Sequence, residues 1–291
     1  MALRRWTYKV LGKRFIPSPQ LFSMPVEIDL NGLGVIVTAS SRGIGFNVAR
    51  ELLKRNARVV ISSRSEENLK KALKELSEYG EVYGVIADVG EKEDLENLVS
   101  KAWDALDGVD ALVWNAPNVS CEPCLTHEAS YADWLEAARL HSVAPGYLTT
   151  LLIRKWIESR KRGILVYLNS VSIKEPMPPL VLADVTRAGL IQLAKSVSRT
   201  YGKRGIRAYS VLLGSFDTPG ARENLKAVAE ARGEPFEETW EREVLGRTPL
   251  HRTGRWSELG SLVAFLLSEE AEYMLGSTVV IDGVMTGGVD L

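Results

Sequence analysis

The feature that most constrains the fold is a run of small residues, Thr38 to Gly45, between a predicted strand and a predicted helix. An apolar run over residues 33–37 precedes it, and a helix-forming run over residues 46–56 follows it. Such a tight turn lets backbone N–H groups and a helix N-terminus approach a pyrophosphate. Gly43 and Gly45 lack the Cβ atoms that would block this approach. The segment therefore predicts a dinucleotide-binding site.

Predicted strands and helices alternate along the rest of the chain. Further strands are expected at residues 58–62, 81–87, 109–114, 163–168, 206–213 and 277–281, and helices at 66–79, 91–106, 131–160, 180–201 and 257–267. Near-continuous apolar strands separated by amphipathic helices are typical of a parallel sheet covered on both faces. We therefore expect an α/β fold with a Rossmann-type, doubly wound, parallel seven-stranded sheet in one domain, residues 27–291. Ligands of such sheets bind at the carboxyl ends of the strands.

Two segments stand outside this alternation. Residues 219–253 are charged and helix-rich and follow the sixth strand, so they predict a helical substrate lid over the carboxyl edge of the sheet. A solvated helical excursion is the alternative. Residues 1–26 carry five basic residues and no acid, which predicts a basic N-terminal extension. It is either a tail or an arm that touches a membrane surface or a neighbouring subunit.

Composition excludes several functional classes. The net charge of −1 argues against nucleic acid as a partner, and no apolar run approaches the roughly 18 residues that span a bilayer. The two cysteines, Cys121 and Cys124, are too few for a disulfide framework, so a cytoplasmic location is expected. With His127 they could bind zinc or form a redox pair, but a fourth ligand is missing. We expect ordinary loop cysteines and no metal.

Further landmarks follow the glycine turn in order: Asp88 after the third strand, Asn115-Ala116 after the fourth, and Gly214 and Thr218 after the sixth. Together with the turn, they resemble the short-chain dehydrogenase/reductase family over about residues 29–290. The family's T-G-x-x-x-G-x-G motif is matched except at its first glycine, where Ala39 stands. The branch implied is the 3-oxoacyl-[acyl-carrier-protein] reductase-like group. The cofactor-binding residues that the resemblance and the turn indicate are Thr38, Ser40, Ser41, Arg42, Gly43, Ile44, Gly45, Arg64, Asp88, Val89, Asn115, Ala116, Arg187, Gly214 and Thr218.

The end of the second strand indicates which cofactor binds. Relatives that prefer NAD usually carry an acid there, which binds the adenine-ribose hydroxyls. This strand instead runs into Ser63 and Arg64. The guanidinium of Arg64 offers a planar fork of donors for a 2′-phosphate, and Arg42 is a second candidate. We therefore expect NADP(H) over NAD(H), with two solvated arginines as the alternative.

The catalytic positions depart from the family pattern of Ser, Tyr-x-x-x-Lys and Asn. By resemblance, Ser170 matches the Ser, but Ala183 stands at the Tyr, Arg187 at the Lys and His141 at the Asn. Ketone reduction builds negative charge on oxygen, to which an acid must deliver a proton. Alanine has no proton to give, and arginine stays charged. Arg187 is therefore expected to hold the cofactor ribose, while another group supplies the proton.

Two substitute acids are predicted. His141 ordinarily titrates near neutrality, and Tyr167 lies three residues before Ser170; a histidine satisfied within a helix and a packed core tyrosine are the alternatives. Asp184 fits better as a charge near a helix N-terminus. Pro145, four residues after His141, cannot donate to the His141 carbonyl, which favours a retained relay-like site.

The expected function is an NAD(P)(H)-dependent oxidoreductase acting on a carbonyl/alcohol pair of a small-molecule substrate. The resemblance implies a homo-oligomer, either a dimer or a tetramer. The alternative is a catalytically silent dinucleotide-binding sensor or assembly subunit, which the absence of the family's Tyr and Lys favours.

Overall fold

The computed structural model describes residues 28–288, so the predicted extension over residues 1–26 lies outside the described residues. Seven strands of this part form one sheet in the order β3-β2-β1-β4-β5-β6-β7, and every neighbouring pair is parallel. The strands are β1 Gly34–Val37, β2 Arg58–Ser63, β3 Val82–Ile86, β4 Ala111–Trp114, β5 Gly163–Ser170, β6 Ile206–Leu213 and β7 Thr278–Ile281. The predicted doubly wound fold is confirmed.

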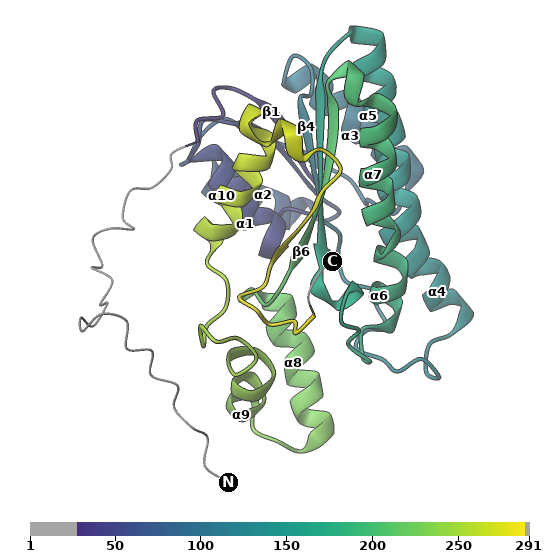
Figure 1. Ribbon diagram of the computed structural model, residues 1–291, viewed down its shortest axis with the longest axis vertical. Helices are drawn as coiled ribbons and strands as arrows, with labels where there is room; N and C mark the ends of the chain where they lie inside the picture. The colour runs from purple at the N-terminus through teal and green to yellow at the C-terminus, as the bar shows by residue number, and fades with distance from the viewer. Residues whose placement is uncertain (1–27, 289–291) are drawn as a thin grey trace, which may run out of the picture.

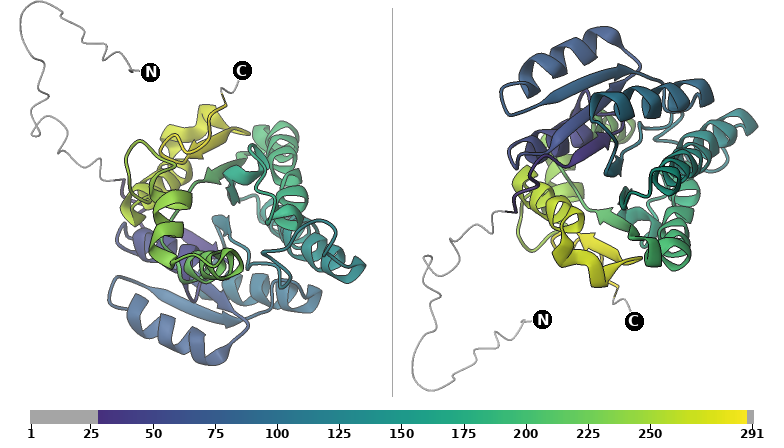
Figure 2. Two further views of the ribbon diagram at one scale, coloured as in Figure 1. Left: turned by 90° about the horizontal axis from the view of Figure 1, so that it is seen from below. Right: turned by 90° about the horizontal axis from the view of Figure 1, so that it is seen from above.

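Helices cover both faces of the sheet (Figure 1; Figure 2). One layer holds α1 Gly43–Leu53, α2 Glu66–Leu76 and α10 Trp256–Leu267, and the other holds α3 Lys92–Ala105, α5 Ala144–Ser159 and α7 Gly189–Tyr201. Alternation along the strands fills both layers, because successive side chains point to opposite faces. In β1, Val35 and Val37 join one core and Ile36 joins the other.

Two predicted helices are interrupted where they approach the carboxyl edge of the sheet. The predicted helix over 131–160 consists of α4 Tyr131–Ala138, a π-helix η2 Arg139–Val143, and α5. The predicted helix over 180–201 divides at Ala188 into α6 Val181–Arg187 and α7. Both interruptions lie beside the ends of β4 and β5, so they shape the site described below.

The segment after β6 forms α8 Pro219–Arg232, α9 Phe236–Trp240 and a π-helix η5 Glu241–Leu245. Short 3-10 helices occur at η3 Val171–Ile173, η4 Gly202–Arg204 and η6 Glu269–Met274. Over residues 28–288, every helix is too short or too polar to cross a lipid bilayer.

Candidate functional site

A cleft of about 920 Å³ opens at the carboxyl edge of the sheet. One wall of this cleft comes from the loops that follow β1, β2, β3 and β4, and the other from α8, α9 and η5. The predicted cofactor residues that line it are Ser41, Arg42, Gly43, Ile44, Arg64, Asp88, Val89, Asn115, Ala116, Gly214 and Thr218. The topology thus brings loops from four separate strands to one edge, as expected for a switch point between β1 and β4.

The glycine turn can accept an anion. The N-cap residue of α1, Arg42, makes no side-chain capping bond, so within residues 28–288 the first N–H groups of this helix have no side-chain partner. A Cβ added to Gly45 would lie 2.9 Å from the Ala39 carbonyl oxygen and 2.9 Å from the Asn115 amide nitrogen. Only glycine allows such close packing, and the exposed amides fit a pyrophosphate.

Three of the predicted cofactor residues lie behind the turn and not in the cleft. Thr38 Oγ1 donates to the Asn115 carbonyl (2.7 Å) and accepts from the Asn115 N–H (2.8 Å), which joins the ends of β1 and β4. Ser40 Oγ donates to the Val37 carbonyl (2.6 Å) and accepts from the Ser62 N–H (3.1 Å). Like Gly45, both are buried. These residues hold the turn in shape instead of lining the cleft.

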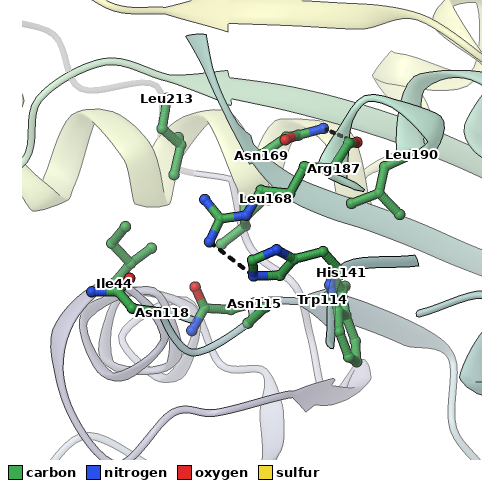
Figure 3. Close-up of a pocket in the computed structure, with 11 residues that line it drawn as sticks. Ile44, Trp114, Asn115, Asn118, His141, Leu168, Asn169, Arg187, Leu190 and Leu213 are labelled. Atoms are coloured by element: carbon green, nitrogen blue, oxygen red, sulfur yellow. Dashed lines mark hydrogen bonds between the residues drawn. The ribbon is translucent and has the colours of Figure 1, made fainter. Parts of the chain in front are cut away.

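A second cavity, of about 80 Å³, lies where the loop after β4 meets α6 and η2. Figure 3 shows Arg187, from α6, pointing into this cavity toward His141, with Asn115 beside them. Arg187 Nη2 lies 3.1 Å from His141 Nε2. The predicted ribose-binding residue and the predicted histidine are therefore in direct contact.

Both ring nitrogens of His141 lie within hydrogen-bonding distance of neighbouring groups. His141 Nδ1 lies 3.1 Å from Thr186 Oγ1, and this hydroxyl gives its only proton to the Leu182 carbonyl (2.6 Å). A hydroxyl used in this way can accept from Nδ1. His141 Nε2 lies 3.1 Å from Arg187 Nη2, a donor, and 3.2 Å from the Pro117 carbonyl oxygen, an acceptor, so these two neighbours favour opposite protonation of this nitrogen. Burial, and then the charge of Arg187, lower the pKa of His141 to about 3. The expectation that this histidine carries protons near neutrality is wrong, because it is neutral there.

Tyr167 is a core residue. Its side chain is fully buried between β5 and α5, and its hydroxyl pairs with Thr149 Oγ1 at 2.7 Å. Burial raises the pKa of the phenol. The prediction that Tyr167 supplies the proton is wrong, because period-2 alternation along β5 turns this side chain away from the cleft.

The helix irregularity next to His141 is larger than the sequence indicates. In η2 the Ala144 N–H donates to the Arg139 carbonyl, five residues back. Pro145 follows directly and has no N–H to offer. A π segment combined with a proline leaves this part of the helix short of backbone donors, as the sequence predicts for the His141 region, and π segments of this kind are frequent at functional sites.

Ser170 ends β5 and lines the cleft, where Ser172 contacts it. Nearby lie two buried carboxyl groups that sequence reasoning passed over or assigned elsewhere. Glu122 Oε1 accepts from the Ala183 N–H at 2.7 Å, and Asp184 Oδ2 accepts from the Met177 N–H at 2.9 Å. Burial is the main cause that raises the pKa of both carboxyls. In the sequence, Glu122 is marked by its position between Cys121 and Cys124.

The cysteines themselves remain ordinary thiols. Cys121 and Cys124 are both free, and burial raises the pKa of Cys124 to about 12, so its thiol is protonated. Between residues 28 and 288, His, Cys, Asp and Glu side chains do not gather in groups of three or more that could hold a metal ion.

Comparison with known proteins agrees with this geometry. A protein-family model described as enoyl-(acyl carrier protein) reductase matches residues 38–286. Human dehydrogenase/reductase SDR family member 4 is 31% identical over 252 residues, 85% of each chain. A tropinone reductase homologue of Arabidopsis thaliana is 28% identical over 260 residues, 88% of this chain and 80% of the relative.

Two solved structures are similar in fold. L-sorbose reductase from Gluconobacter frateurii, complexed with NADPH and L-sorbose, has a TM-score of 0.83 and 26% identity, covering 90% of this chain and 100% of that chain. A variant of actinorhodin polyketide ketoreductase with NADPH has a TM-score of 0.82 and 25% identity, covering 88% and 98%.

Proposed function

Because the chain belongs to the short-chain dehydrogenase/reductase family, we propose that this NAD(P)-dependent oxidoreductase interconverts a ketone and its alcohol with NADP(H). The observation that carries the proposal is the single cleft that holds the glycine turn, Arg64 and Ser170 together. The L-sorbose reductase and the polyketide ketoreductase are both complexed with NADPH, which supports the choice of cofactor.

The described residues fit an NADP(H) molecule. The uncapped amides at the start of α1 would bind the pyrophosphate, and Asp88, in the loop after β3, would contact the adenine. Arg64 is exposed at the end of β2 and lines the cleft, so its guanidinium would bind the 2′-phosphate. When bound, the nicotinamide supplies or accepts the hydride.

Ala183 and Arg187 would stand where most relatives carry Tyr and Lys. Arg187 has five N–H donors and uses one of them on His141, so the others can bind the nicotinamide ribose and stabilise negative charge in the cavity. The neutral His141 fixes the orientation of this guanidinium. The family's basic residue would thus be replaced by a permanently charged one that positions and does not exchange protons.

The substrate end of the cleft combines apolar and charged side chains. Met177, Leu225, Val228, Trp240 and a run of prolines line it beside Arg232, Glu243 and Arg247. Its apolar part would fit the chain of a 3-oxoacyl-like ketone. Residues 219–253 would act as the lid, and Arg42 of the glycine turn already faces Glu223 of α8 at 3.9 Å.

The surface of α4 and α5 fits assembly into a dimer or tetramer. Tyr131, Leu135, Val143 and Ile157 are large, apolar and exposed on this helix pair and the π-helix between its parts. Light scattering of the purified protein, compared with a Leu135→Glu variant, tests whether this face joins subunits.

A substrate screen tests the function. NADPH oxidation is followed with three classes of ketone, namely 3-oxoacyl thioesters, cyclic ketones and ketoses, while NADPH affinity is measured by fluorescence. We expect turnover, and Ser170→Ala should lower kcat by about 100-fold or more while leaving NADPH affinity unchanged. Tight NADPH binding without turnover on every class would instead identify a silent dinucleotide-binding protein.

A further inference from the structure

We propose that Asp184, Ser172 and Ser170 form a proton relay that serves the substrate oxygen in place of a side-chain acid at Ala183. The inference rests on the proposed function and deepens it. Ser170 touches the substrate in this arrangement, whereas Ser172 and Asp184 are positioning residues that act through it.

The hydroxyl of Ser170 is arranged to donate. Ser172 Oγ donates to Ser170 Oγ at 2.8 Å, and the Ser172 N–H donates to the same oxygen at 3.1 Å. A serine oxygen has two acceptor sites and one proton. Because both acceptor sites are filled from within the protein, the free capacity of Ser170 is its own O–H, which lies at the wall of the cleft.

The carboxyl group of Asp184 is arranged to hold a proton. The residue is 8% exposed, and Oδ2 accepts from the Met177 N–H. Oδ1 is buried and has no hydrogen-bond partner within residues 28–288. Ser172 is nevertheless close enough to the carboxyl group to lower its pKa. A buried carboxylate oxygen without a partner is costly. Protonation lowers this cost, because it removes the negative charge from the buried oxygen and turns it into a donor, for which Ser172 is the acceptor in the proposed relay.

Burial and the neighbouring groups act on the pKa of this carboxyl in opposite senses, and burial is the largest cause. Burial raises the pKa of Asp184, while Ser172, the Met177 N–H and the charge of Arg187 lower it. Glu122, from the loop after β4, is the other buried carboxyl, and Asp184 contributes to raising its pKa. The guanidinium of Arg187 thus lowers the pKa of both buried acids, Glu122 and Asp184. Each acid accepts one backbone N–H, and we assign the proton to Asp184 because its Oδ1 is buried and has no hydrogen-bond partner within residues 28–288.

The protonated carboxyl of Asp184 and the hydroxyls of Ser172 and Ser170 then donate in one direction, toward the cleft. During reduction, hydride adds to the carbonyl carbon and the C=O π pair moves onto the oxygen. Ser170 gives its proton to that oxygen, Ser172 replaces the proton of Ser170, and Asp184 replaces that of Ser172. Asp184 ends as a carboxylate and regains a proton from water. Alcohol oxidation runs the same chain in reverse, so every proton is accounted for.

The decisive variants remove the proton source but keep the shape. Asp184→Asn retains an oxygen for the Met177 N–H, and Ser172→Ala interrupts the chain in its middle. Each should lower kcat by about 100-fold or more with unchanged NADPH affinity, and the double variant should be no slower than either single one, because the groups act in series. Ser172→Thr restores the hydroxyl and should recover most of kcat. Ser142→Ala is the matched control. Ser142 Oγ donates to the carbonyl of Thr186, which lies on the same helix as Asp184, α6, but outside the relay.

Two further measurements separate the relay from a structural role. The pH profile of kcat should lose one limb in Asp184→Asn, and the infrared difference between wild type and this variant should show a protonated carboxyl at neutral pH. An ionised Asp184, wild-type kcat in both variants, or a kcat loss that Ser172→Thr does not rescue overturns the relay. Absence of turnover in the wild type on every ketone overturns the proposed function instead, while the infrared result still decides the state of Asp184.

Discussion

The two sides of the cleft are built on different principles. On the cofactor side, β1 and β4 are followed by short polar residues that pair with each other through hydrogen bonds, as between Thr38 and Asn115. On the catalytic side, η2, α6 and the loop after β4 bury four ionisable groups, namely Glu122, His141, Asp184 and Arg187. The first side depends on backbone shape and the second on protonation state. Substitutions should therefore affect geometry on one side and titration on the other.

The largest effect is expected from Gly45→Val, on the cofactor side. The new side chain would press against the Ala39 carbonyl and the backbone of Ser40, which cannot move without opening the turn. Overpacking of this kind costs about 1–3 kcal/mol, and we expect the upper end, which is about 100-fold in the Kd for NADPH. Isothermal titration measures it. Gly146→Ala, where an added Cβ meets nothing within 4 Å, is the control. Unchanged NADPH affinity in Gly45→Val would contradict the view that the backbone geometry of the glycine turn determines cofactor binding.

The second effect concerns titration on the catalytic side. His141 has a pKa of about 3 when folded, below its ordinary 6.5, so the unfolded chain binds more protons between these values. Stability is then lost as the pH falls below about 6.5, by about 2 kcal/mol between pH 7 and pH 5. His141→Asn should lose this slope in urea unfolding.

Glu122 and Asp184 act in the opposite sense, because their raised pKa values give stability that is present at low pH and lost as the pH rises. Both groups remain in the His141→Asn variant, so the difference between the two proteins isolates the histidine. Equal slopes in wild type and variant would show that His141 is not held neutral by burial.

A smaller effect is expected from Arg64→Ala, which returns to the cofactor side. An exposed guanidinium that binds a 2′-phosphate contributes about 1.4 kcal/mol, so NADPH should bind about tenfold more weakly. NADH, which has no such phosphate, should bind as before. Arg42→Ala tests the second candidate in the same assay. Equal losses for NADPH and NADH would place Arg64 elsewhere than at the 2′-phosphate.

The smallest effect is expected from Tyr167→Phe. The variant loses the bond to Thr149 Oγ1, which costs about 1 kcal/mol of stability and leaves kcat and its pH dependence unchanged. A second substitution, Thr149→Val, should recover part of the loss, because it removes the unpaired hydroxyl. Chemical denaturation and steady-state kinetics measure the two quantities. A large fall in kcat would reinstate the phenol as an acid.

The sequence predicts the cofactor side well for a physical reason. Apolar runs and glycine spacing determine strands and turns locally, and the apolar run of β6 predicts its observed bounds, Ile206–Leu213. Most of the predicted cofactor residues line the cleft. On the catalytic side the relevant property is burial, which arises from packing between distant segments. Neither the inward turn of Tyr167 nor the neutral state of His141 is visible in one strand or helix read alone.

Asp184 Oδ1, which has no hydrogen-bond partner in the part of the chain that the structure describes, has a consequence for engineering this protein. Replacing a poorly paired buried acid with an apolar side chain of similar size often stabilises a fold. A library selected for heat resistance would therefore be enriched in apolar residues at position 184, and its most robust members would be its slowest. Selection for turnover should come first in such work, because at this position heat resistance and activity favour different residues.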